Sequence, residues 1–227
     1  MTDGRGFDRF QRAMSVFAKH YIDPAWKSKK TKGIVLDRPT DSAFSSVFYG
    51  YIEISNTLEA LKLCETLIGV APPRSKAVKH DEYFKFLVGA YLQEMYILEQ
   101  RLSTYAKRMS RLYKKPQIQQ IIDQFVSKSL EGIVKTRGAH VHAQRYSDNE
   151  LDMLSTLTLI SQFDADYTEH LKEQYWLAQL EWGKKVKTNN SATREIVDHY
   201  FDVLYPLMTK DDRFGLPRAG KSSTPRP

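Results

Sequence analysis

Apolar residues recur at steps of three and four along most of the chain. This spacing places them on one face of an α-helix, whereas no alternating pattern of comparable length predicts β-strands. The longest such stripe belongs to a helix expected to begin near Asp81, a favourable N-cap residue. Its members are Leu87, Tyr91, Met95, Leu98, Leu102, Tyr105, Met109 and Leu112. We therefore predict an all-α fold, an antiparallel helical bundle of about six to seven helices with short loops.

Boundary residues place the other helices. We expect a first helix to end at Pro24, because proline disfavours helix at the residue before it. A second helix is expected to stop before Gly69. A capping box of Ser147 and Glu150 predicts the start of a fifth helix. The remaining helices are expected from Pro116 to about residue 136, from about residue 166 and from about residue 191.

The same pattern predicts one helical domain over residues 1–212. Residues 213–227 are rich in Pro, Gly and Ser and contain several basic residues, so we expect a flexible basic tail. The lysine-rich stretch 27–38 is interpreted as part of a solvated connector, with an anion-seeking loop as the alternative.

Composition limits the classes of function. The chain has 34 Lys and Arg against 27 Asp and Glu, a net charge of +7 that favours phosphate-bearing partners without requiring them. A single cysteine, Cys64, cannot form an internal disulfide and is expected to be a small core residue. We find no apolar run of the roughly 20 residues that cross a bilayer and no apolar signal core near the N-terminus. These features predict a cytoplasmic protein that is not inserted in a membrane.

Titratable side chains crowd together in one place, at Arg137, His140, His142 and Arg145. Histidine exchanges protons near neutral pH, and arginine offers a fixed fork of donors to a phosphate. On an ideal helix His142 would lie about 140° around the axis from Arg137. A helix break at Gly138 would allow both side chains to reach one cleft, where they could act on a phosphodiester.

Two other interpretations of this cluster were weighed. In a metal site His140 and His142 would supply at most two ligands, with no carboxylate at a familiar spacing, so this interpretation is the weaker one and we expect no metal. We expect no other cofactor either. The cluster would instead be purely structural if its side chains cap the fourth helix, pair with neighbouring carboxylates and hold a turn between helices.

The run Arg137-Gly-Ala-His-Val-His142 resembles the Arg-x4–6-His motif of HEPN domains, helical bundles in which this motif often serves metal-independent RNA cleavage at a dimer interface. The resemblance implies that His142 acts as general base or acid at a ribose 2′-hydroxyl. It implies that Arg137 holds the scissile phosphate, and that His140 is an auxiliary polar group. A polar residue from an earlier helix often joins such sites, and Glu94 and Glu99 are both candidates.

The same arginine-to-histidine spacing occurs twice more, from Arg74 to His80 and from Arg194 to His199. We prefer the copy at Arg137 because it follows a long amphipathic helix and contains a second histidine.

The functional hypothesis is therefore a homodimeric HEPN-like protein that binds RNA and cleaves it. Its candidate nucleic-acid contacts are Arg108, Arg111, Lys115 and Arg145. The alternatives are a non-catalytic helical module that docks a protein or nucleic acid, and a structural or regulatory bundle without a site.

Overall fold

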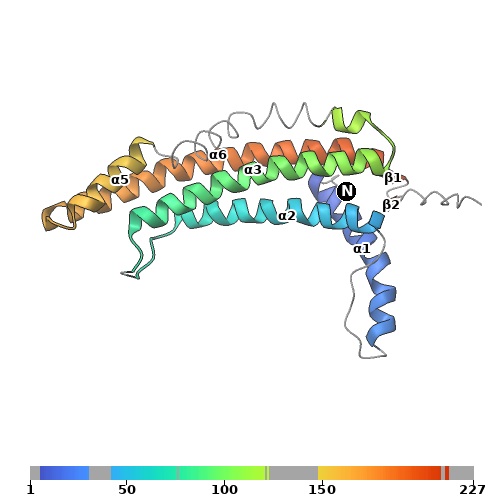
Figure 1. The fold of residues 1–227 in the computed structure, drawn as a ribbon, viewed down its shortest axis with the longest axis horizontal. Coiled ribbons are helices and arrows are strands. Elements are labelled where there is room, and N and C mark those ends of the chain that lie inside the picture. The colour runs from blue at the N-terminus through green and yellow to red at the C-terminus, as the bar shows by residue number, and fades with distance from the viewer. Residues whose placement is uncertain are drawn as a thin grey trace, which may run out of the picture. The chain divides into compact units, whose positions relative to one another are not determined.

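The computed structural model describes residues 6–30, 42–75, 77–120, 122, 148–210 and 213–214. Within these ranges the chain is almost entirely helical, which confirms the predicted all-α helical bundle (Figure 1). The elements are α1 (Gly6–Lys30), α2 (Ser42–Gly69), α3 (His80–Leu112), α5 (Asn149–Ile160), the 3-10 helix η1 (Ala165–Tyr167), α6 (Thr168–Met208), β1 (Thr209–Lys210) and β2 (Arg213–Phe214). Residues 117–120 are helical as well.

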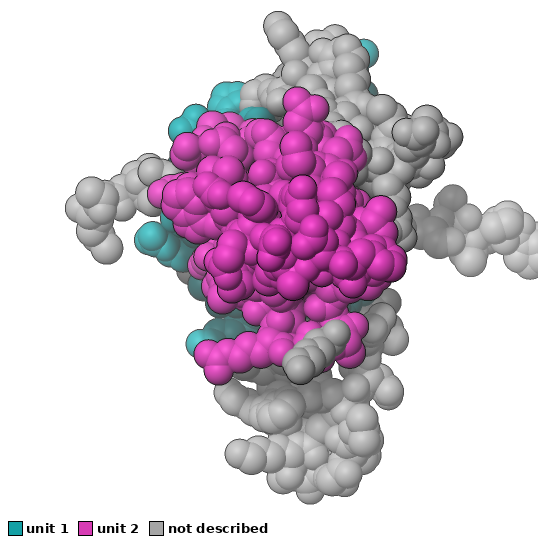
Figure 2. All heavy atoms as spheres, turned by 90° about the vertical axis from the view of Figure 1, so that its left-hand side faces the viewer, with its two compact units in different colours: residues 1–53, 102–125, 195–227 teal, residues 54–101, 126–194 magenta. Residues whose placement is uncertain are grey.

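The chain divides into two compact units, which Figure 2 colours separately. Unit 1 comprises residues 1–53, 102–125 and 195–227, and unit 2 comprises residues 54–101 and 126–194. Each of α2, α3 and α6 supplies one segment to each unit. Each of these long helices therefore has buried apolar residues in both units.

Aromatic rings form the core of unit 1. The ring of Phe10 lies 4.4 Å from that of Phe201, 5.7 Å from Tyr51 and 5.1 Å from Phe214, measured between centroids. Phe10 and Phe201 are completely buried. Aromatic pairs of this kind add about 0.5–1.5 kcal/mol beyond the burial of their area. This cluster ties α1 and the strand pair to the last turns of α6.

Polar contacts with α6 fix the N-terminus of α1. The first backbone N–H groups of a helix have no partner within it, and here the Phe7 N–H donates to Asp198 Oδ1 at 3.1 Å. Arg9 pairs with Asp202 at 2.9 Å. A Cβ at Gly6 would collide with the backbone oxygen of Asp198. The absence of a side chain at Gly6 therefore permits this close approach.

In unit 2, two hydrogen bonds between α6 and α2 show how these helices run relative to each other. Asn190 Nδ2 donates to the carbonyl of Leu61 at 3.4 Å, and Gln179 Nε2 donates to that of Ile68 at 3.0 Å. Since residue numbers rise along α2 as they fall along α6, the two helices are antiparallel.

The third long helix of this unit, α3, runs parallel to α6. The ring of Phe84 packs 5.5 Å from that of Tyr175, and further along both helices Thr193 contacts Met95. The guanidinium of Arg101 donates to the hydroxyl of Thr57 on α2.

The apolar stripe predicted for α3 is confirmed, because its residues from Leu87 to Met109 are buried and Leu112 is half-buried. The expected end of α2 and the expected start of α3 fall within one residue of their observed positions. Cys64 is buried as predicted, and burial, followed by the nearby Glu94 carboxylate, raises the pKa of its thiol.

The two predicted helices from about residues 166 and 191 are in fact one helix, α6. The predicted boundary near residue 191 lies in a polar stretch that includes Asn190. Its side chains instead bind neighbouring helices: Asn190 Nδ2 donates to Glu65 Oε2 at 2.7 Å, and Thr193 is buried against Met95. Polar residues that have partners on an adjacent helix need not end their own.

One other boundary was wrong. The first helix continues through Pro24 to Lys30, so the beginning of the predicted connector is helical. A proline removes one helical hydrogen bond, and the turns around it can outweigh that loss. Arg213 and Phe214, the first two residues of the predicted tail, form β2 and pair with β1. The ring of Phe214 explains this, since it packs against Phe10.

Candidate functional site

The central residues of the predicted site lie outside the described part of the structure. This applies to Arg137, His140, His142 and Arg145. Their convergence on one cleft therefore stays a prediction. The first described residue after them is Asp148, six positions beyond His142.

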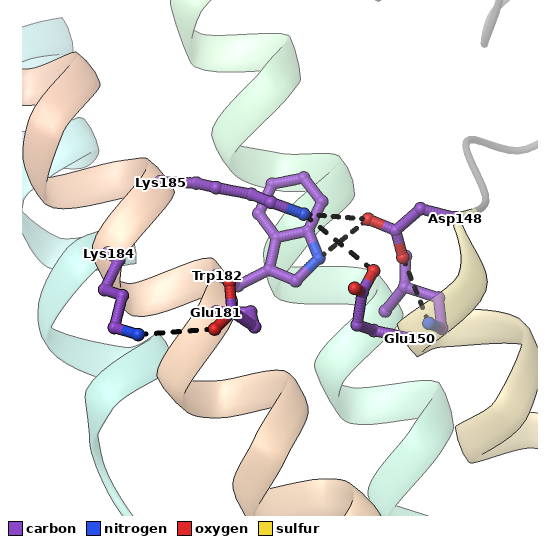
Figure 3. Close-up of polar contacts among 7 residues, drawn as sticks. Asp148, Glu150, Glu181, Trp182, Lys184 and Lys185 are labelled. Atoms are coloured by element: carbon purple, nitrogen blue, oxygen red, sulfur yellow. Dashed lines mark hydrogen bonds and ion pairs between the residues drawn. The ribbon is translucent and has the colours of Figure 1, made fainter.

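Asp148 joins the beginning of α5 to α6 through both of its carboxylate oxygens (Figure 3). Its backbone is extended, with φ −140° and ψ 175°, and its Oδ1 accepts from the Leu151 N–H at 3.1 Å. Its Oδ2 accepts from the indole Nε1 of Trp182 at 3.1 Å. Asp148 is thus the N-cap of α5, one residue later than the predicted Ser147.

Lys185 adds positive charge to this contact. Its Nζ lies 3.5 Å from Asp148 Oδ2 and 3.8 Å from Glu150 Oε2, and it sits 5.1 Å from the centre of the Trp182 ring. The Asp148 side chain is only 17% exposed, so its charge is partly removed from water and needs these partners. We name Asp148, Trp182 and Lys185 the α5 anchor. It fixes the point at which the segment containing the predicted site enters α5.

Sequence reasoning placed Asp148 beside the titratable cluster but did not identify its partners. An aspartate directly before an apolar stripe is a recognisable N-cap. Nothing in the spacing indicated that Trp182 and Lys185 would meet it, because they lie more than thirty residues away along the chain.

Of the predicted nucleic-acid contacts, Arg108 and Arg111 lie near the end of α3 in unit 1 and are exposed. Three positions apart, they share one side of the helix. Lys115 is half-buried, and its Nζ donates to the carbonyl of Leu207 at 3.2 Å. Lys115 therefore satisfies a carbonyl in the last turn of α6, and the two arginines are the freer phosphate contacts.

A Schellman motif ends α3 and orients Lys115. Lys114 has a left-handed backbone, with φ 55°. The Lys115 N–H donates to the Ser110 carbonyl at 2.9 Å, and the Lys114 N–H donates to that of Arg111 at 3.3 Å. Glycine is the usual residue at the left-handed position. A lysine there bears some backbone strain.

The two acidic candidates on α3 lie in unit 2. Glu94 is half-buried and influences the Cys64 thiol, and Glu99 accepts from the side chain of Gln100 at 3.3 Å. Neither contact selects one of them as a partner of His142.

The structure also places the other two copies of the arginine-to-histidine spacing. The His80 ring begins α3 and packs 5.6 Å from the ring of Tyr175. Arg194 and His199 lie within the continuous helix α6. A five-residue step turns a helix by about 140° beyond a full circle, so these two side chains diverge.

A groove of about 420 Å³ lies between α2 and α6 in unit 2. Its lining residues include both signs of charge, with Glu59, Glu65, Lys62, Lys187 and Arg194 among them. The residues that line it include no histidine or cysteine, so the groove offers no group that exchanges protons near neutral pH.

Over the described ranges, no three or more His, Cys, Asp or Glu side chains gather closely enough to hold a metal ion. None of the described helices combines the length and apolar character that a membrane span requires. Comparison with known proteins finds no matching family model, no matching curated protein and no matching solved structure. No relative therefore assigns an activity to this chain.

Proposed function

We propose that this chain is a HEPN-like, RNA-binding protein that forms a homodimer and cleaves RNA without a metal ion. The observation that supports this proposal is the sequence from Arg137 to His142, which resembles the HEPN motif and belongs to a chain whose described residues form an all-α bundle. The α5 anchor adds support, because it would hold the far end of the catalytic segment in place.

The reaction follows from the two side-chain types. A base removes the proton of a ribose 2′-hydroxyl, and the 2′-oxygen then attacks the neighbouring phosphorus. The bond from phosphorus to the 5′-oxygen breaks, and that oxygen receives a proton from an acid. His142 performs one of these two proton transfers, and Arg137 stabilises the negative charge that develops on the phosphate. The products are a 2′,3′-cyclic phosphate and a free 5′-hydroxyl.

RNA binding would use the basic residues outside this pair. Arg108 and Arg111 are exposed on α3, and Arg145 follows the motif. Each phosphate that such residues neutralise releases bound counterions, so affinity should fall steeply as salt rises. A cytoplasmic location fits this substrate, and it fits a chain whose single cysteine is buried and reduced.

The test is incubation of the purified protein with end-labelled single-stranded RNA in excess EDTA. We expect fragments that end in cyclic phosphate, and no cleavage of an RNA with a 2′-deoxy sugar at the cleaved position. Arg137→Ala and His142→Ala should abolish cleavage while preserving the helical circular-dichroism signal. Arg74→Ala and His199→Ala are matched controls from the other two spacings and should cleave like the wild type.

Equal cleavage by the wild type and both catalytic variants would show that the activity belongs to a contaminant and would contradict the proposal. Salt-sensitive RNA binding without any cleavage would favour the non-catalytic interaction module instead. That module would still bind RNA through Arg108 and Arg111. Replacing both arginines by alanine should therefore lower both the affinity for RNA and its dependence on salt.

A further inference from the structure

The hairpin formed by α5, η1 and the first half of α6 exposes large apolar side chains. Figure 1 shows α5 folding back along α6, and Figure 2 views unit 2 from the end at which this hairpin turns. The exposed fraction is 85% for Phe163 in the turn and 59% for Leu159 on α5. On α6 it is 57% for Trp176 and 40% for Leu180.

The exposed residues of α6 form one stripe. Glu169, Glu173, Trp176 and Leu180 are all exposed and follow steps of four, three and four, which places them on one side of the helix. The other side contains residues that are buried in unit 2: Tyr175, Ala178 and Trp182. The helix thus has an inner apolar face and an outer face that is part apolar and part acidic.

Burying one large apolar side chain contributes about 1.5–3 kcal/mol. Isolated exposed apolar residues are common on protein surfaces, but exposed apolar residues that share one side of a helix with acidic residues mark an interaction site, and Trp176 and Leu180 lie so on α6. Phe163 and Trp176 are aromatic, the type most enriched where proteins bind each other.

The charge of the hairpin indicates what binds there. Residues 152–180 contain five acidic residues and one lysine, all exposed, for a net charge of −4. The whole chain has a net charge of +7, so the rest of it bears +11. The acidic residues are Asp152, Asp164, Asp166, Glu169 and Glu173. Phosphate backbones are repelled by such a surface, and so is the same surface of a second copy in a symmetric pair.

We propose that this hairpin surface, made of Leu159, Phe163, Trp176 and Leu180 with the surrounding carboxylates, docks a basic amphipathic helix of a different protein. The apolar face of the partner helix covers the aromatic rings, and its lysines or arginines meet the carboxylates. The surface belongs to unit 2, whereas the exposed arginines of α3 belong to unit 1. The inference does not depend on RNA cleavage, and its test is independent of that activity.

The probe is a fluorescein-labelled synthetic helix with leucines on one side and lysines on the other, titrated with the full chain by fluorescence anisotropy. We expect saturable binding that weakens with rising salt. A peptide with glutamates in place of the lysines should not bind, nor should one with serines in place of the leucines.

Two sets of variants separate the apolar and the charged parts. Phe163→Ser with Trp176→Ser should weaken binding about tenfold or more. The triple variant Asp164→Lys, Asp166→Lys and Glu173→Lys should weaken binding of the lysine peptide by a similar factor. It should also enable the glutamate peptide to bind. Phe86→Ser is the matched control, since Phe86 is 70% exposed on α3 outside the hairpin, and it should change the affinity less than twofold.

A variant that merely unfolds would not gain binding of the glutamate peptide. That gain therefore shows that the variant with three lysines is folded. Equal affinity of the lysine peptide for the wild type and both sets of hairpin variants would overturn the proposal. Loss of RNA binding in the Phe163 and Trp176 variant would also overturn it, by assigning the surface to nucleic acid. Salt-sensitive self-association that these variants remove would overturn it in favour of a second copy of this chain.

Discussion

Replacing Asp148 by alanine should destabilise the fold by about 2–4 kcal/mol. Losing the N-cap of a helix typically costs about 1 kcal/mol. Removing the acceptor of the indole N–H of Trp182, a residue only 4% exposed, costs a further 1–3 kcal/mol, roughly. The ion pair with Lys185 adds little, because that lysine side chain is 43% exposed.

Asp148→Asn separates the two contributions. Asparagine caps helices about as well as aspartate, but its one oxygen cannot serve both the Leu151 N–H and the Trp182 indole. We therefore expect Asp148→Asn to cost about 1–2 kcal/mol, less than Asp148→Ala. Trp182→Phe should remove the same hydrogen bond from the other side.

Urea denaturation followed by far-ultraviolet circular dichroism measures these changes, and hydrogen exchange at the Leu151 amide gives a local readout. That amide should exchange faster in Asp148→Ala and be little changed in Asp148→Asn. The double variant Asp148→Ala with Trp182→Phe should lose about 1 kcal/mol less free energy of unfolding than the sum of the losses in the two single variants. Additive effects within about 0.5 kcal/mol would show that the contact between Asp148 and Trp182 does not stabilise the fold.

Three further predictions concern other parts of the two units. Gly50→Ala should destabilise unit 1 by about 1–3 kcal/mol in urea denaturation, because its Cβ would lie 2.6 Å from the ring of Tyr105; Gly183→Ala, with open space around it, should be neutral or stabilising by up to about 1 kcal/mol. Lys114→Gly should raise the free energy of unfolding by about 1 kcal/mol by relieving the left-handed backbone, and a loss of stability would refute that explanation. Burial raises the pKa of Tyr175 from 10.0 to about 12, so its contribution to stability is complete below pH 10 and is lost as pH rises through about 12. Thermal unfolding at increasing alkaline pH measures that loss, and a phenol that ionises near pH 10 in the folded protein would contradict it.

Much of the fold could be predicted because helical spacing reports which side of each helix is buried. The stripe along α3 was identified residue by residue, since a buried face needs apolar side chains at regular intervals. Two of the features that the sequence did not predict share a cause. The stretch around Asn190 and the strand at Phe214 depend on partners from distant parts of the chain, and local preference does not contain that information. The helix through Pro24 is a different case, because the turns on either side of a proline can outweigh the one hydrogen bond that it removes.

The candidate site was less predictable, because its contacts join residues far apart in sequence. Asp148 could be recognised as a capping residue, but the indole of Trp182 that occupies its second oxygen could not. Lys115 shows the same limit. Its charge suggested a phosphate contact, and the structure adds a hydrogen bond to the Leu207 carbonyl that the sequence did not indicate. Basic residues near a helix end are therefore of two kinds. Some already bind a group inside the protein, and others, such as Arg108 and Arg111, face water.

The two copies of the spacing at Arg137 and Arg194 show why a short motif needs its backbone context. Both place a histidine five positions after an arginine. In α6 the backbone is helical throughout, so Arg194 and His199 point about 140° apart and cannot hold one phosphate. For Arg137 and His142 to hold one phosphate, the chain would have to depart from a regular helix between them, and Gly138 is the residue there that would tolerate such a departure. The catalytic proposal therefore depends on the backbone at Gly138 as much as on the two side chains.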